Sequence, residues 1–136
     1  MGSLEEVQAE TASSGRKILE GAGITAGDIS FENMYDGYPQ FHQFHIEGLG
    51  YRGMKEGDAL DFYQTDISIE GPNPILSSGG NIGGGRTRFW MHTDSIQQIQ
   101  GRAGARSLTG VKPEIAVSGG PTPFGGNFTV WSATPD

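Results

Sequence analysis

The sequence predicts an α/β domain in which helices cover both faces of a mixed, mostly parallel sheet whose last strand runs antiparallel. Two observations favour this class. Segments with helical periodicity alternate with short strand-like segments along the chain, and the last two strand-like segments are joined by a tight connection. Alternation favours parallel pairing, whereas a tight connection joins antiparallel neighbours. With 136 residues, of which 35% are hydrophobic, the chain fits a single domain with a modest core.

The first half of the chain predicts a helix, a strand and a second helix. Ser3 followed by Glu6 fits a capping box, and apolar residues then recur at helical spacing until the glycines at 21–23. Residues 29–34 alternate apolar with polar side chains, which is typical of a strand. Pro39 suits the first turn of the next helix. The buried side of that helix would consist of Phe41, Phe44, Ile46 and Leu49.

The second half begins with an irregular segment. Residues 52–73 are polar, charged and contain glycine, so we interpret them as an insertion that departs from the domain, with room for a short strand at 66–70. Regular elements then resume. In order, we expect a short buried strand at 74–78, a helix at 92–102, and strands at 114–118 and 127–133.

Charge and composition exclude several classes of function. The net charge of −7 argues against nucleic acids and anionic membranes as partners, because both would repel this surface. The chain has no cysteine, so it supplies no disulfide, no thiolate zinc site and no cysteine nucleophile. Its first residues have neither the basic end nor the apolar core of a signal peptide, and no apolar run is long enough to span a membrane, so we expect a cytoplasmic location.

Glycine is the most unusual feature of the composition. The 23 glycines gather in clusters that directly follow short apolar runs. Tight turns and close backbone approaches to a ligand are made at such places. The clusters are therefore either loops at the edge of an active site or plain turns. They lie at 79–80, 83–85, 119–120 and 125–126.

Three segments, which together cover almost the whole chain, carry a family resemblance. They contain AGI (22–24), MYDGY (34–38) and EGLGY (47–51); NPILSSGG (73–80) and GRTR (85–88); and IQGRAGAR (99–106) and AVSGG (116–120). In this order they resemble the C-terminal half of thiolases, especially the lipid-transfer or sterol-carrier-protein branch. The resemblance implies that residues 1–136 form a thiolase-like C-terminal domain, one half of a five-layer αβαβα fold.

The same resemblance implies partners. Such a half normally begins with a strand before its first helix, whereas here the helix begins almost at Met1. We therefore expect a partner that is an N-terminal thiolase half or a thiolase-like subunit. As in several proteins of this branch, a small zinc-ribbon or OB-fold companion protein is a further expected partner.

The chemistry at the matched positions departs from that of thiolases. Arg86 follows Gly85 where Gly-His is expected, Val117 stands near the place of a second cysteine, and Tyr35 replaces an asparagine. These departures resemble the steroid side-chain-cleaving aldolases of the superfamily. The resemblance thus implies a retro-aldol cleavage of a carbon–carbon bond in a steroid or lipid acyl-CoA.

The candidate site follows from that reaction. Tyr35 is the candidate acid/base and Asp36 a second catalytic candidate, although Tyr35 is equally compatible with packing and Asp36 with capping the next helix. Coenzyme A would enter only as part of the substrate, with no covalently bound cofactor. Glycine-turn N–H groups could stabilise an enolate, and an arginine could meet phosphates. The candidate substrate- and CoA-binding residues are Gly79, Gly80, Arg86, Gly119 and Gly120.

The sequence has three histidines, at positions 42, 45 and 92. His42 and His45 lie three residues apart, but no third ligand is suggested by spacing, so we expect no metal. We interpret His92 as a helix cap or a solvated residue. Two alternative functions stay open, a non-catalytic thiolase-like subunit for assembly or acyl-CoA binding and a degenerate acetyl-CoA acyltransferase. A lipid-binding module has the weakest support.

Overall fold

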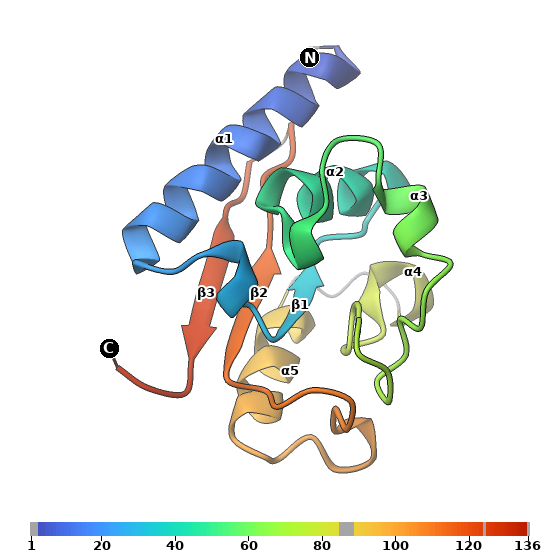
Figure 1. Ribbon diagram of the computed structural model, residues 1–136, viewed down its shortest axis with the longest axis vertical. Coiled ribbons are helices and arrows are strands. Elements are labelled where there is room, and N and C mark those ends of the chain that lie inside the picture. The colour runs from blue at the N-terminus through green and yellow to red at the C-terminus, as the bar shows by residue number, and fades with distance from the viewer. Residues whose placement is uncertain (1–2, 85–88, 124, 136) are drawn as a thin grey trace.

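The computed structural model describes residues 3–84, 89–123 and 125–135 and has a three-stranded sheet at its centre (Figure 1). The strand order is β1 (Phe31–Met34), β2 (Ile115–Gly119) and β3 (Phe128–Ser132). β1 and β2 are parallel, and β2 and β3 are antiparallel. The mixed sheet with an antiparallel last strand is therefore confirmed.

Helices cover both faces of this sheet. On one face, α1 (Leu4–Ala22) and α2 (Pro39–Leu49) pack together, and on the other lies α5 (Trp90–Ile99) (Figure 1). Shorter helical segments connect these elements. They are the α-helices α3 (Ala59–Phe62) and α4 (Gly80–Gly84) and the 3₁₀ turns Ala26–Asp28, Tyr51–Gly53 and Gly104–Arg106. Among the described residues, no helix combines the length and the hydrophobicity that crossing a bilayer requires.

The two long helices of the first half begin and end where local signals place them. The Ser3 hydroxyl accepts a hydrogen bond from the Glu6 amide at 3.3 Å, and the Glu6 carboxylate accepts one from the Ser3 amide at 3.0 Å. This reciprocal pair is the expected capping box. The two helices cross closely, because a Cβ added at Gly15 would lie only 2.8 Å from the carbonyl oxygen of Gly48.

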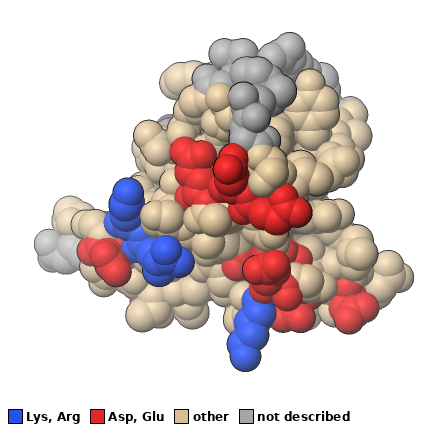
Figure 2. All heavy atoms as spheres, turned by 90° about the horizontal axis from the view of Figure 1, so that it is seen from above, with Lys and Arg blue, Asp and Glu red and all other residues tan. Residues whose placement is uncertain are grey.

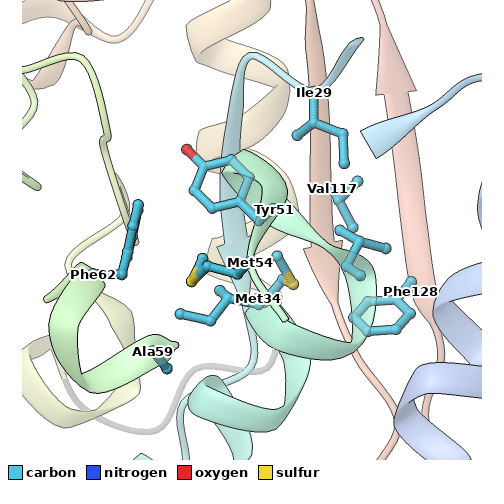
Figure 3. Packing of buried hydrophobic residues seen from close by; sticks show 10 residues of the cluster. Ile29, Met34, Tyr51, Met54, Ala59, Phe62, Val117 and Phe128 are labelled. Carbon is cyan, nitrogen blue, oxygen red and sulfur yellow. The ribbon is translucent and has the colours of Figure 1, made fainter. Parts of the chain in front are cut away.

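The sheet separates two apolar clusters because side chains alternate between its faces. The larger cluster lies on the α2 side and includes Met34, Val117 and Phe128 (Figure 3). The smaller one lies on the α5 side and is built around Phe31 and Ala116, with Trp131 packed against it. The core is therefore continuous with both helix layers.

The structure corrects the expected strand at residues 74–78, which form no strand. Leu76 has a positive φ of 44°, which an extended strand cannot contain. Two side chains of β1 instead take up the backbone amides here. Glu32 accepts from the Leu76 amide at 3.1 Å and Asn33 from the Ser78 amide at 2.9 Å.

The segment 52–73 contains the short helix α3, and its side chains enter the main core. Met54, Ala59 and Phe62 are buried there, and the Phe62 ring meets that of Tyr51 edge-on at 5.9 Å (Figure 3). No strand forms at 66–70, because the Asp66 carboxylate accepts hydrogen bonds from the amide and hydroxyl of Ser68 and makes a turn. Helix α5 begins two residues before the expected start and ends three residues before the expected end.

Candidate active site at the carboxyl ends of β1 and β2

The residues singled out from the sequence meet where two parallel strands end. Tyr35 follows β1 directly, and Gly119 and Gly120 lie at the end of β2. The Tyr35 amide donates to the carbonyl oxygen of Gly119 at 2.8 Å, which fixes the two strand ends side by side. In open α/β sheets, ligands bind at the carboxyl ends of strands, so this edge is the natural place for a site.

Tyr35 presents its hydroxyl at this edge. Its side chain is half-buried, and its ring stacks on Phe41 with the centroids 6.3 Å apart. The hydroxyl lies over Gly37, where an added Cβ would overlap it. Within the described part of the chain, no residue hydrogen-bonds this hydroxyl. The ring is therefore held by packing.

Asp36 has a different role from its neighbour. Its carboxylate is 3% exposed and accepts hydrogen bonds from the amide of Asn81 at 2.6 Å and from that of Ile82 at 3.4 Å. It thus caps the start of α4. The expectation that it might cap the next helix is corrected, since α2 follows Tyr38 without a side-chain cap. We assign Asp36 the task of positioning the turn before α4.

The glycines allow unusual backbone conformations and close contacts. Gly79 and Gly80 have φ values of 90° and 66°, and a Cβ at Gly80 would overlap the Asp36 carboxylate. Their amides are already engaged. The Gly79 amide donates to Leu76 O at 2.8 Å, that of Gly80 to Ser78 Oγ at 3.2 Å and that of Gly120 to Asn127 O at 3.1 Å. These three N–H groups are not free to bind an oxyanion.

Two neighbouring side chains of β1 hold the turn that contains Gly79 and Gly80. Glu32, on the α2 side, accepts from His42 Nε2 at 2.9 Å in addition to the Leu76 amide. Asn33, on the α5 side, donates to Asp94 Oδ2 at 3.0 Å and also binds both Ser77 and Ser78. Because Glu32 and Asn33 are fully buried, the turn is tied to the sheet from both faces.

Two histidines flank the double glycine Gly119-Gly120 from opposite faces of the sheet. His45, on α2, is fully buried, and a Cβ added at Gly120 would lie 2.5 Å from its Cε1. Its Nε2 lies 2.8 Å from Pro121 O, to which it donates. Burial lowers the pKa of His45 from 6.5 to about 4, so the ring is neutral at pH 7.

His92, on α5, lies against Gly119. A Cβ added there would be 3.3 Å from His92 Cε1 and 3.9 Å from Nε2. Its Nδ1 lies 2.6 Å from the hydroxyl of Ser118, which also accepts a hydrogen bond from the indole of Trp131 at 2.8 Å. Partial burial lowers the pKa of His92. The ring is thus neither a helix cap nor a fully solvated group, contrary to our interpretation of the sequence.

The sequence provided little signal for these two histidines. Both belong to helices, and their partners are distant along the chain, at Pro121 for His45 and at Ser118 for His92. The spacing of His42 and His45 suggested at most a metal pair. In the structure His42 binds Glu32 and Tyr63 instead, and the described residues contain no group of three potential metal ligands. The one available signal was that His92 and the double glycine both lie next to predicted element ends.

Arg86, the remaining candidate residue for binding coenzyme A, lies outside the described residues. A hollow beside the turn, lined by Met34, Asp36 and Trp90, holds essentially no open volume. A groove of about 280 Å³ between α1 and α2 is lined by Glu5 and Glu47, among others. Acidic side chains also gather on the face seen in Figure 2, and such surfaces repel the phosphates of coenzyme A.

Comparisons with known proteins agree with this fold. A solved structure named "Ltp2-ChsH2(DUF35) aldolase" superposes with a TM-score of 0.75 at 19% sequence identity. The similarity covers 94% of this chain but 33% of that one, so the chain spans about a third of the length of that protein. No curated protein matches the sequence. The family model "Thiolase C-terminal domain-like" matches residues 3–128. The chain therefore belongs to the thiolase C-terminal domain-like family.

Proposed function

We propose that the chain is a component of a thiolase-like aldolase that cleaves a carbon–carbon bond of an acyl-CoA by a retro-aldol reaction. The observation that carries this proposal is the tyrosine hydroxyl at the carboxyl end of β1, for which the described residues offer no hydrogen-bond partner. It occurs in a thiolase-family domain that has no cysteine. The structural neighbour, which is named as an aldolase, supports the same class of reaction.

In the proposed reaction Tyr35 moves one proton. As the general base it takes the proton from the β-hydroxyl group of the substrate, and the bond between the α- and β-carbons breaks. The β-carbon becomes a ketone, and the electron pair of the broken bond forms the enolate of the thioester. Tyr35 then returns the proton to the α-carbon. The products are a ketone and a shorter acyl-CoA, and the tyrosine is restored.

The proposal includes the substrate and the partners. We favour a steroid or another bulky lipid side chain as the acyl group, because the departures from the thiolase pattern resemble those of steroid side-chain-cleaving aldolases. Coenzyme A enters with the substrate. The chain matches a third of its structural neighbour, whose name joins two components. We therefore propose that an N-terminal thiolase half completes the site, that a zinc-ribbon or OB-fold companion belongs to the assembly, and that the assembly is cytoplasmic.

The test is the variant Tyr35→Phe in the complete assembly, with Tyr38→Phe as the matched control. Tyr38 is three residues away and 56% exposed, and its ring meets the same Phe41 edge-on at 5.4 Å. Loss of a general acid/base is expected to lower kcat for cleavage about 10²- to 10⁴-fold in Tyr35→Phe. Tyr38→Phe should keep the kcat of the wild type.

Full cleavage by Tyr35→Phe would contradict the mechanism. If the assembly also dissociated when the chain was deleted, the chain would instead be a non-catalytic subunit needed for assembly. Measuring the mass of the assembly for each variant separates these results, because a catalytic defect leaves the particle intact.

A further inference from the structure

The proposed reaction places a negative charge on the thioester oxygen, and a hydrogen-bond donor must stabilise it. Backbone N–H groups of the glycine turns were the expected donors. The amides of Gly79, Gly80 and Gly120, however, all donate within the chain. A side chain next to Gly119 and Gly120 is an alternative donor.

His92 is a side chain beside the same strand ends. Its ring edge, formed by Cε1 and Nε2, faces Gly119, whose carbonyl oxygen accepts the hydrogen bond from the amide of Tyr35. Gly119, where φ is 76°, allows this close approach, because an added Cβ would also lie 2.8 Å from the carbonyl oxygen of Asn127. Throughout the described ranges, no residue is a hydrogen-bond partner of His92 Nε2.

A chain of hydrogen bonds decides which ring nitrogen carries the proton. The indole of Trp131 can only donate, so Ser118 Oγ accepts from it at 2.8 Å. The Ser118 side chain is fully buried, and the one acceptor that the described residues offer its hydroxyl hydrogen is His92 Nδ1, at 2.6 Å. Nδ1 therefore accepts, and in the neutral ring the proton is on Nε2.

Protonation of the ring would disturb this arrangement. With protons on both nitrogens, Ser118 Oγ would face two donors, the indole and Nδ1–H, and its own hydrogen would lose its acceptor. The lowered pKa of His92, which burial causes, favours the same neutral form. The side chain is thus a neutral donor with its proton on Nε2.

We infer that His92 is a further catalytic residue, which donates a hydrogen bond from Nε2 to the thioester oxygen as the enolate forms. This inference rests on the proposed function and adds a second group to the same site. Trp131 and Ser118 act as positioning residues that fix the tautomer. No covalent bond to His92 forms or breaks, and its proton stays on Nε2.

Two substitutions separate this role from a structural one. The amide of Asn in His92→Asn can replace Nδ1 beside Ser118 but has no group at the place of Nε2. The longer side chain in His92→Gln places an amide N–H near the position of Nε2. A donor role predicts that kcat falls about 10²-fold in His92→Asn, with KM changed little, and is partly restored in His92→Gln. A structural role, through the bond to Ser118, predicts the opposite order.

The experiment compares both variants with the wild type and Tyr35→Phe in the complete assembly, and nitrogen NMR reads the tautomer of the His92 ring. Cleavage by the wild type that is lost in Tyr35→Phe but kept in His92→Asn would overturn the inference and leave the proposed function standing. A proton found on Nδ1 instead of Nε2 would overturn it without any activity measurement. A wild-type assembly that cleaves no β-hydroxyacyl-CoA would overturn the proposed function and this inference together.

Discussion

The double glycine Gly119-Gly120 has a different histidine environment on each side of the sheet. On the α2 side, His45 is 0% exposed, bonded to a backbone carbonyl and pressed against Gly120. On the α5 side, His92 lies against Gly119 but is half-buried, and its Nε2 has no described partner. Two histidines at adjacent glycines therefore differ in role. His45 packs in the core, whereas His92 is the proposed hydrogen-bond donor. Burial and partners, rather than residue type, make this difference.

The polar residues of β1 extend the comparison. Glu32 enters the α2 side and meets His42, whereas Asn33 enters the α5 side and meets Asp94. Both hold the turn before α4, and each side buries a carboxylate, Glu32 itself on the α2 side and Asp94 on the α5 side. Removing one partner from a buried, hydrogen-bonded set of this kind leaves donors unsatisfied. Substitutions on the α2 side should therefore lower the free energy of unfolding strongly.

The largest effect is expected for Glu32→Ala. It removes the acceptor for His42 Nε2 and for the amides of Met34 and Leu76, and should lower the free energy of unfolding by about 4 kcal/mol. Urea denaturation measures this change. The control is Glu114→Ala, which breaks an exposed pair with Lys112 and should cost less than about 1 kcal/mol. Equal losses in both variants would contradict the central role of Glu32.

The next effect is a loss of stability in acid that depends on His45. Below pH 6.5 the unfolded chain takes up a proton that folded His45 binds only near pH 4. Stability should therefore fall as the pH is lowered from 6.5 to 4, by about 3 kcal/mol from this residue. The measurement is urea unfolding across this range for the wild type and His45→Gln. The variant should lack this part of the pH dependence. Identical pH profiles for both proteins would show that His45 is not shielded from protonation in the folded state.

A smaller difference should separate two glycines of the loop between β2 and β3. Both Gly120 and Gly125 have positive φ, but a new Cβ meets the His45 ring at Gly120 and nothing within 4 Å at Gly125. Gly120→Ala should be less stable than Gly125→Ala by about 2 kcal/mol, because backbone strain is common to both and overpacking to one. Thermal unfolding of the pair tests the contact. Equal stabilities would mean that His45 moves aside without cost.

The smallest effect on stability is expected at the proposed catalytic tyrosine. Tyr35→Phe removes a hydroxyl for which the described residues offer no hydrogen-bond partner and keeps the ring on Phe41. The free energy of unfolding should change by less than about 0.5 kcal/mol. A loss above about 1.5 kcal/mol would indicate that the hydroxyl is a structural group and would weaken its catalytic assignment.

Local signals predicted much of the fold. The capping box at Ser3, Pro39 at the start of α2 and the last strand each depend on neighbouring residues, and each appears in the structure. The expected strand at 74–78 fails because Glu32 and Asn33, more than 40 residues away, take its amide groups. A local sequence pattern does not show that distant side chains compete with a neighbouring strand for these amides.

The site was predictable only in part for the same reason. The sequence pointed to Tyr35, which the strand end places beside Gly119. The cap that Asp36 provides to α4 and the bond between His92 and Ser118 join residues 45 and 26 positions apart, and the long-range packing alone creates them. The resemblance to thiolases also gave no reason to single out His92, whereas its neighbours in space do.

The central claim is tested most directly by the products of the complete assembly, incubated in D₂O with a β-hydroxyacyl-CoA that carries a bulky tertiary alcohol. A retro-aldol cleavage predicts equal amounts of ketone and shorter acyl-CoA, one deuterium at the α-carbon of the latter, and no requirement for free coenzyme A. Absence of cleavage, or cleavage that needs free coenzyme A as an acyltransferase would, contradicts the account.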